Sequence, residues 1–246
     1  MKTIYRKEFV IDPIYTDRYL QAKPSSLLYF AQEAAADHCL QLEADWDTLN
    51  KKHLFWAVIR HKVQINRLPV QGERITVETW PMPTTRVAYP RATAGYDSDG
   101  NELFRCISLW VLMDTESRMM ILPEKSGVEV IGALRGNELS VPKNLLPRSF
   151  RNHTFRDVTY SLLDRNGHMN NTRYLDWVDD LLPSAFHQLH RPRELTVCYL
   201  SEAREGQQIC LDWELSEEGI LSVNAHRERT DVPGETERVF SVQTVF

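Results

Sequence analysis

The most restrictive feature of this sequence is an order of predicted secondary structure that occurs twice. A strand and a helix are followed by a run of strands with short turns, first within residues 1–135 and again within residues 148–246. Residues 63–72 match residues 197–206 at an offset of 134, and Tyr29 matches Tyr174 at an offset of 145. Because internal self-similarity indicates repeated structural units, we expect two copies of one unit in the chain.

Two segments have the apolar spacing of helices. The first covers residues 24–42, with Ser25 or Ser26 as the expected N-cap. Its apolar stripe consists of Leu27, Leu28, Ala31, Ala34, Ala35, Cys39 and Leu42. The second is expected to begin at Asn170 or Asn171 and to run to residue 182, where Pro183 ends or bends it.

Most of the remaining chain alternates between apolar and polar residues, which predicts β-strands. The predicted strands cover residues 55–65, 74–80, 86–96 and 103–113 in the first half, and 194–200, 207–215, 220–229 and 235–246 in the second. Strict alternation would place every second residue from Phe55 to Ile65 on one face. The turn at residues 97–101, Asp-Ser-Asp-Gly-Asn, predicts a hairpin.

These elements predict an α+β fold in which each half is an antiparallel sheet wrapped around a long central helix. The expected boundaries are residues 1–135 for the first unit, 136–147 for the linker and 148–246 for the second unit. Two such units would form an internal pseudo-dimer with a cleft between them, where ligand sites are common. Since the pseudo-dimer removes the need to dimerise, both a monomer and a homodimer remain open.

Composition excludes several classes of function. The chain has 246 residues and a net charge of −5, and no block is basic enough for a nucleic-acid surface. No apolar run is long enough for a membrane span or a secretory signal, so we expect a cytoplasmic protein. The cysteines, expected to be buried small residues, show no metal-binding spacing, so no metal is predicted. They are Cys39, Cys106, Cys198 and Cys210.

The densest polar group lies just before the second predicted helix. Asp164, Asn166 and His168 occupy alternate positions there, so an extended loop would point a carboxylate, an amide and an imidazole the same way. Backbone N–H groups from Gly167 to Asn170 would face a developing oxyanion. A plain helix-capping loop is the alternative interpretation of the same residues.

The run from Asp164 through Asn166, His168, Asn170 and Asn171 to Tyr174 resembles the signature of the acyl-ACP thioesterases. Segments 58–60, 66–69, 79–80 and 108–111 resemble strands in the first half of that family, so the resemblance spans nearly the whole chain. It implies a double hotdog fold, which agrees with the repeat, and hydrolysis of fatty acyl thioesters carried by acyl carrier protein (ACP).

The resemblance also implies catalytic roles for Asp164, Asn166, His168 and Glu202. Either Glu202 or His168 would activate water, and direct attack by a carboxylate is a further alternative. Many plant members carry a cysteine, once proposed as the nucleophile, where this chain has Ala203. No cofactor is expected.

The internal repeat predicts one active site per chain. The two offsets pair Glu202 with Leu68, His168 with Lys23 and Asn166 with Gln21, so the first half lacks the catalytic group. That half is instead expected to shape the acyl pocket. The expected substrate-binding residues are Leu27, Leu28, Ala31, Ala35 and Asn170.

The expected partner is ACP, which is acidic, whereas this chain is itself negative. Docking would therefore need a local basic patch, and Arg148 and Arg151 are the candidates. An acyl-CoA thioesterase, a non-catalytic acyl-binding protein and a hotdog hydratase remain the competing functions.

Overall fold

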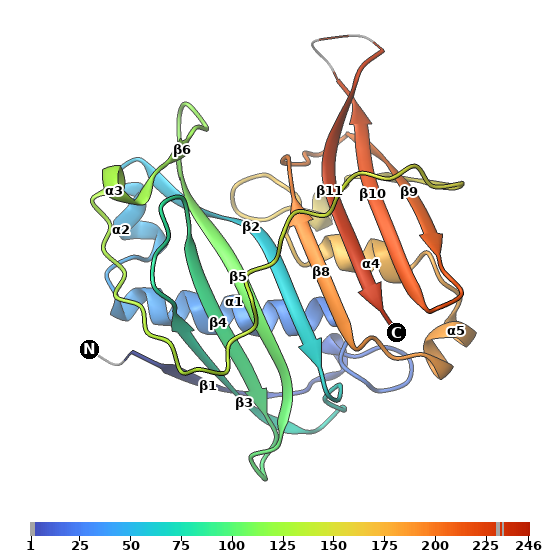
Figure 1. Cartoon of the computed structure of the whole chain (residues 1–246), viewed down its shortest axis with the longest axis horizontal. Helices are drawn as coiled ribbons and strands as arrows, with labels where there is room; N and C mark the ends of the chain where they lie inside the picture. Colours follow the sequence, from blue (N-terminus) through green and yellow to red (C-terminus); the bar gives the residue numbers. More distant parts are fainter. Residues whose placement is uncertain (1–2, 230–231, 233) are drawn as a thin grey trace. The chain divides into compact units, whose positions relative to one another are not determined.

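The chain divides into two compact units. The computed structural model describes residues 3–229, 232 and 234–246. One unit spans Met1–Pro142 and the other spans Lys143–Phe246, so the division falls inside the segment 136–147. Each unit contains one antiparallel sheet and at least one helix, and together they form the α+β architecture expected from the sequence (Figure 1).

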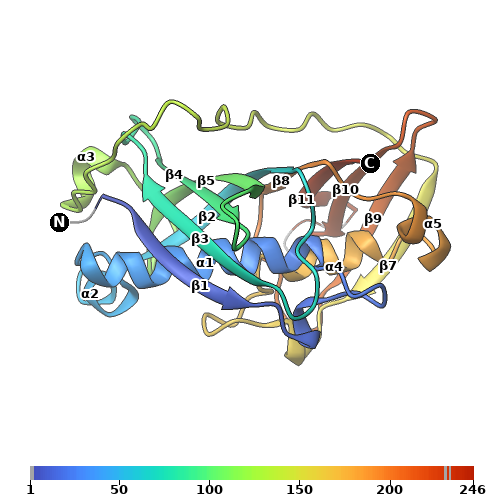
Figure 2. The same cartoon turned by 90° about the horizontal axis from the view of Figure 1, so that it is seen from below.

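The first unit is a curved sheet around one long helix. Its strands, in spatial order, are β1 (Tyr5–Val10), β3 (Arg74–Pro81), β4 (Tyr89–Tyr96), β5 (Glu102–Asp114) and β2 (Leu54–Ile65), and β6 (Met120–Ile121) pairs with β5. Neighbouring strands are antiparallel. Figure 2 shows α1 (Pro24–Gln41) along the face of this sheet, beside β1 and β3. Short helices cover Pro13–Tyr15 (η1), Trp46–Asn50 (α2) and Pro123–Ser126 (α3).

The helix predicted over residues 24–42 is confirmed, but its start differs from the expectation. Lys23 is the N-cap and makes no side-chain cap, because its ammonium group cannot accept a hydrogen bond. Pro24 occupies the first turn, where its missing N–H costs nothing. Ser26 instead donates its hydroxyl to the carbonyl of Tyr15, 2.8 Å away. The small buried residues Ala31, Ala34 and Ala35 allow the helix to lie close to the sheet.

A β-bulge breaks the alternation predicted along β2. Pairing with β5 shifts between Val58 and Arg60, so Ile59 is the extra residue. Val58 and His61 are both buried although they are three positions apart, which strict alternation would not allow. The expectation of one continuous face from Phe55 to Ile65 is therefore wrong.

The second unit has the same plan with a shorter helix. Its strands, in spatial order, are β8 (Glu194–Tyr199), β11 (Thr236–Val245), β10 (Ile220–Glu228), β9 (Gln208–Leu215) and β7 (Asn152–Asp157). The expected long helix is instead α4 (Arg173–Asp179), followed after Pro183 by α5 (Ser184–Leu189). A short helix, η2 (Tyr160–Leu162), precedes the loop that carries the candidate site.

The connecting segment is fixed to each unit by hydrogen bonds rather than being free. Arg135 pairs with the buried Glu78 at 2.6 Å, and Glu138 accepts the indole N–H of Trp80 at 3.0 Å, so this part belongs to the first unit. In the second unit, Arg238 donates to the carbonyl of Leu145, 3.4 Å away. Among the described helices, none combines the length and apolarity that crossing a bilayer requires.

Candidate active site

The loop between η2 and α4 is shaped by the carboxylate of Asp164. Its Oδ1 accepts the backbone N–H groups of Asn166 at 2.7 Å and His168 at 3.4 Å. The backbone N–H of Asp164 donates to the carbonyl of His168 at 2.8 Å, which closes the loop. Gly167 has φ +75°, a conformation that costs glycine little.

The same loop is attached to the turn that follows β8. Met169 donates its backbone N–H to the carbonyl of Ala203 at 2.8 Å, and His168 forms a β-bridge with Arg204. This pairing brings the imidazole Nε2 of His168 to 3.0 Å from Oε2 of Glu202. The side chain of His168 is 13% exposed and that of Glu202 is 38% exposed, so the pair lies at the surface rather than in the core.

Arg227 on β10 holds the turn that carries Glu202. Its guanidinium donates to the backbone carbonyl of Glu202, to Ser201 Oγ at 2.9 Å and to Glu237 Oε2 at 2.7 Å. Arg204 adds a second positive group 3.8 Å from Oε2 of Glu202. The sequence analysis missed Arg227, because nothing local in β10 distinguishes it from other strand residues.

Tyr174 fixes the first turn of α4 against this turn. Its ring packs against Tyr199 and Phe240, and the backbone of Ala203 forms a hydrogen bond with its hydroxyl. Burial raises the pKa of Tyr174 well above its usual value, so the phenol stays protonated. Ala203 itself is fully buried.

The first unit contains a copy of the loop. Asp17 Oδ1 accepts the N–H groups of Tyr19 at 2.8 Å and Gln21 at 3.0 Å, as Asp164 does for Asn166 and His168. Gln21 bridges Val70 as His168 bridges Arg204, and Leu20 has a positive φ of 63° where Gly167 has 75°.

This correspondence corrects the offset expected from the sequence. The offset before the helix is 147 rather than 145, so His168 corresponds to Gln21 and Asn166 to Tyr19, whereas Asp164 has a true counterpart in Asp17. The 134 offset still pairs Arg204 with Val70. The first half therefore keeps the aspartate, but it has Gln21 in place of the imidazole and Tyr19 in place of Asn166.

One further expectation differs from the structure. The backbone N–H groups from Gly167 to Asn170 do not face an open space, since they donate to Asp164, Ala203 and Leu162. The side chain of Asn166 is exposed on the loop. Asn170 uses its Oδ1 to accept from the backbone and the hydroxyl of Thr172, at 3.0 and 2.8 Å.

The remaining candidate residues lie in different environments. Leu27, Leu28, Ala31 and Ala35 are buried on α1, with at most 6% of their surface exposed. Arg148 and Arg151 are exposed in the segment before β7.

Comparison with protein-family models decides the family. Residues 2–125 match the N-terminal domain of acyl-ACP thioesterases, and residues 147–242 match the C-terminal domain. The chain belongs to the acyl-ACP thioesterase family.

Individual members of the family are distant relatives. The palmitoyl-acyl carrier protein thioesterase of Gossypium hirsutum is 28% identical over 74% of this chain and 48% of that protein. The dodecanoyl-[acyl-carrier-protein] hydrolase of Cinnamomum camphora is 25% identical over 81% of this chain and 56% of that protein. The chain thus spans about half the length of these curated relatives, which are both described as chloroplastic.

Solved structures show that the fold is that of the family. An acyl-ACP thioesterase from Bacteroides thetaiotaomicron superposes with a TM-score of 0.88 over 99% of this chain and 98% of that one, at 23% identity. The 12:0-ACP thioesterase of Umbellularia californica gives 0.81 over 100% and 97%, at 22% identity. The expected double hotdog fold is confirmed.

Proposed function

We propose that this protein hydrolyses fatty acyl-ACP thioesters to a free fatty acid and ACP. The observation that carries the proposal is the contact of 3.0 Å between His168 Nε2 and Glu202 Oε2, in a chain whose two domains both match acyl-ACP thioesterase models. The curated relatives are named as acyl-ACP thioesterases or hydrolases. Their names therefore agree in both the carrier and the bond that is broken.

In the proposed reaction Glu202 is the general base. His168 directs Nε2 at the carboxylate and so holds Glu202 in place, while Arg204 and Arg227 keep positive charge near the turn. Glu202 takes a proton from water as the water oxygen attacks the thioester carbon. The C–S bond then breaks, and the thiolate of the carrier leaves and takes up a proton.

Two other residues support this reaction in different ways. Asn166 presents an exposed amide on the same loop and would donate to the carbonyl oxygen of the substrate as it becomes negative. Asp164 acts as a positioning residue, because its carboxylate binds backbone groups of the loop. The cytoplasmic location and the state of oligomerisation remain predictions from the sequence.

A single assay separates this function from its competitors. The purified protein is incubated with acyl-ACP, acyl-CoA and an enoyl thioester, and free thiol is measured. Thiol released faster from acyl-ACP than from acyl-CoA supports the proposal. Preference for acyl-CoA would indicate an acyl-CoA thioesterase, a change in the enoyl group without thiol release would indicate a hydratase, and binding without turnover would indicate an acyl-binding protein.

The role of Glu202 is tested by Glu202→Gln, which keeps the size of the side chain and removes the base. We expect kcat on acyl-ACP to fall by roughly 10²–10⁴, the usual contribution of a general base, with little change in thermal stability. Glu205→Gln is the matched control, since Glu205 lies exposed in the same turn. Near-normal kcat in Glu202→Gln would transfer the role of base to His168.

A further inference from the structure

A second group of reactive side chains lies on the sheet of the second unit, on strands β7, β9 and β10. Strand register brings it together: His153 on β7 is paired with Asp212 on β9, and Cys210 on β9 is paired with His226 on β10. Cys210 and Asp212 are two positions apart, so they point to the same face of the sheet. All four residues therefore share one face.

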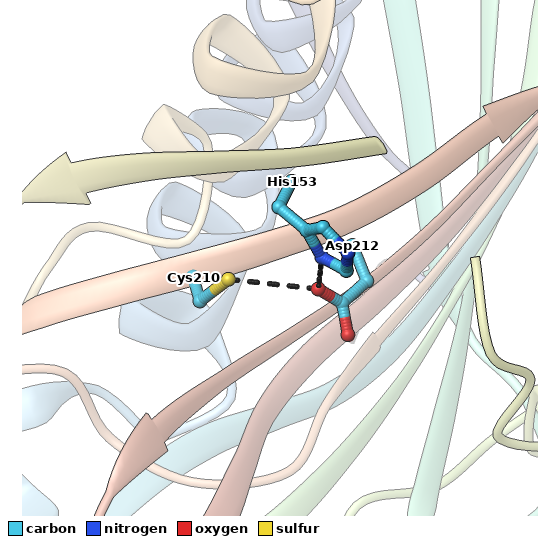
Figure 3. Close-up of side chains that lie close together, drawn as sticks. All are labelled: His153, Cys210 and Asp212. Carbon is cyan, nitrogen blue, oxygen red and sulfur yellow. Dashed lines mark hydrogen bonds and ion pairs between the residues drawn. The ribbon is translucent and has the colours of Figure 1, made fainter. Parts of the chain in front are cut away.

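The distances within this group are short. Asp212 Oδ1 lies 2.6 Å from His153 Nδ1 and 3.5 Å from Cys210 Sγ. Figure 3 marks both contacts with dashed lines. Asp212 Oδ2 lies 3.4 Å from His226 Nδ1. His153, Cys210 and Asp212 each offer one donor atom, and these three atoms lie within 4.8 Å of one another.

The group is reachable from solvent but held on a rigid support. Ile209 and Leu211, which alternate with Cys210 and Asp212 along β9, are fully buried, so the four side chains point away from the core of the unit. The side chain of His153 is 55% exposed, and those of Asp212 and His226 are 19% and 28% exposed. An ion can therefore reach His153, Asp212 and His226 from solvent, and strands of the sheet carry all four residues.

We propose that His153, Cys210 and Asp212 bind one Zn²⁺ ion, with His226 as the fourth ligand. A thiolate, imidazoles and one carboxylate are the ligands that structural and catalytic zinc sites use. Calcium and magnesium are disfavoured because they require mainly oxygen donors.

For His153, Cys210 and Asp212 the geometry needs only a small adjustment, whereas His226, which contacts Asp212 Oδ2, lies outside this close group and has to turn toward the ion. Ligand distances of about 2.0–2.3 Å place tetrahedral donors roughly 3.3–3.8 Å apart. The pair Cys210–Asp212 already has this spacing at 3.5 Å. The 2.6 Å contact between His153 Nδ1 and Asp212 Oδ1 is a hydrogen bond. For the ion to bind, this hydrogen bond must break as the exposed imidazole rotates toward the ion.

The bound ion would stabilise an edge of the sheet. β7 is the last strand of this unit's sheet and pairs with β9, so one of its sides has no strand partner among the described residues. An ion shared by β7, β9 and β10 would attach this edge strand to two others. The site uses neither His168 nor Glu202 and is not needed for the proposed hydrolysis.

The chemistry of Cys210 sets the conditions for binding. Burial, together with the charge of Asp212, raises the pKa of its thiol to about 11. The thiol is therefore protonated at neutral pH in the free protein, and Zn²⁺ must displace this proton to form the thiolate bond.

The test is titration of the full chain with Zn²⁺ and with Co²⁺. We expect one equivalent of Zn²⁺ to bind and to raise the melting temperature, and Co²⁺ to give the thiolate-to-cobalt charge-transfer band in the near ultraviolet. Cys210→Ser should abolish this band. Since loss of even an outer-shell partner costs about 10–100-fold in metal affinity, His153→Gln should weaken Zn²⁺ binding at least tenfold.

Matched controls keep the result unambiguous. Cys39→Ser and His190→Gln change the same residue types elsewhere and should leave binding unchanged, and circular dichroism without metal checks that each variant is folded. The proposal is overturned if the wild type takes up no stoichiometric Zn²⁺. It is also overturned if folded Cys210→Ser or His153→Gln binds Zn²⁺ as the wild type does.

Discussion

Asp164 and Asp17 have the same structural role, because each carboxylate accepts hydrogen bonds from two backbone N–H groups of its loop. Only the loop of Asp164 carries His168. We expect Asp164→Ala and Asp17→Ala to lower the free energy of unfolding by similar amounts, about 1–2 kcal/mol, as lost caps do. Only Asp164→Ala should also lower kcat, by up to about 100-fold, through misplacement of His168. Urea denaturation and kinetics on acyl-ACP measure the two effects; equal kcat in both variants would contradict a positioning role.

His61 makes stability depend on pH. Burial lowers the pKa of this imidazole to about 3 in the folded chain, whereas an unfolded histidine titrates near 6.5. Between these values the unfolded state binds one more proton, so stability falls with decreasing pH by up to about 1.4 kcal/mol per pH unit. We expect His61→Gln to lose less stability than the wild type between pH 7 and pH 5. Denaturation midpoints at both pH values, with exposed His190→Gln as control, test this; parallel losses would contradict it.

At the scale of elements, α1 is the part of the first unit proposed to limit the acyl chain. Ala31 is 3% exposed and lies on the helix face that packs toward the sheet, whereas Ala36 on the same helix is exposed. If the acyl chain ends beside α1, Ala31→Phe should shorten the preferred product, since each excluded methylene forfeits roughly 0.8 kcal/mol of burial. Product chain lengths from mixed acyl-ACPs measure this, with Ala36→Phe as control. Overpacking without any change of product profile would show that Ala31 belongs only to the core.

Helices and strands are predictable from the sequence where one hydrophobic period, helical or alternating, dominates a segment. The strands from β2 to β5 and from β8 to β11 agree with their predicted ranges within a few residues, because alternation and the turn at 97–101 mark them. The second helix was overextended, because its apolar stripe continues through Leu182 although the helix ends at Asp179. The bulge at Ile59 was missed because it depends on pairing with β5, which no local pattern shows.

At the scale of the whole molecule, sequence reasoning reached only the long-range contact that the family resemblance supplies. That resemblance names His168, in the loop before α4, and Glu202, after β8, and the structure places the two side chains together. It did not find the group around Asp212, because His153 lies 59 positions away and strand register alone joins them. The backbone donors of Met169 and Asn170 were misjudged because their acceptors, Ala203 and Leu162, lie outside the motif, whereas Gly167 and His168 donate to Asp164 within it.

The proposed recognition of ACP would depend on the charge of the whole molecule as well as on one patch. The chain carries a net charge of −5, so an acidic carrier must meet local positive charge, and Arg148 and Arg151 are exposed before β7. The hydrogen bond from Asn224 to the carbonyl of Arg148 fixes the backbone there and leaves the guanidinium in solvent. This segment can therefore present its charge without rearranging the sheet.

We expect the double variant Arg148→Glu and Arg151→Glu to raise KM for acyl-ACP at least several-fold, and more at low salt, because charge reversal weakens encounter with an acidic partner. Hydrolysis of a small acyl thioester without a carrier should be unchanged, since neither residue touches His168 or Glu202. The control is Lys51→Glu with Arg86→Glu, two exposed residues whose reversal gives the same net charge. Steady-state kinetics at two salt concentrations distinguish the cases: an equal rise in KM for both pairs would indicate bulk repulsion, and unchanged KM in the first pair would exclude this patch as the docking surface.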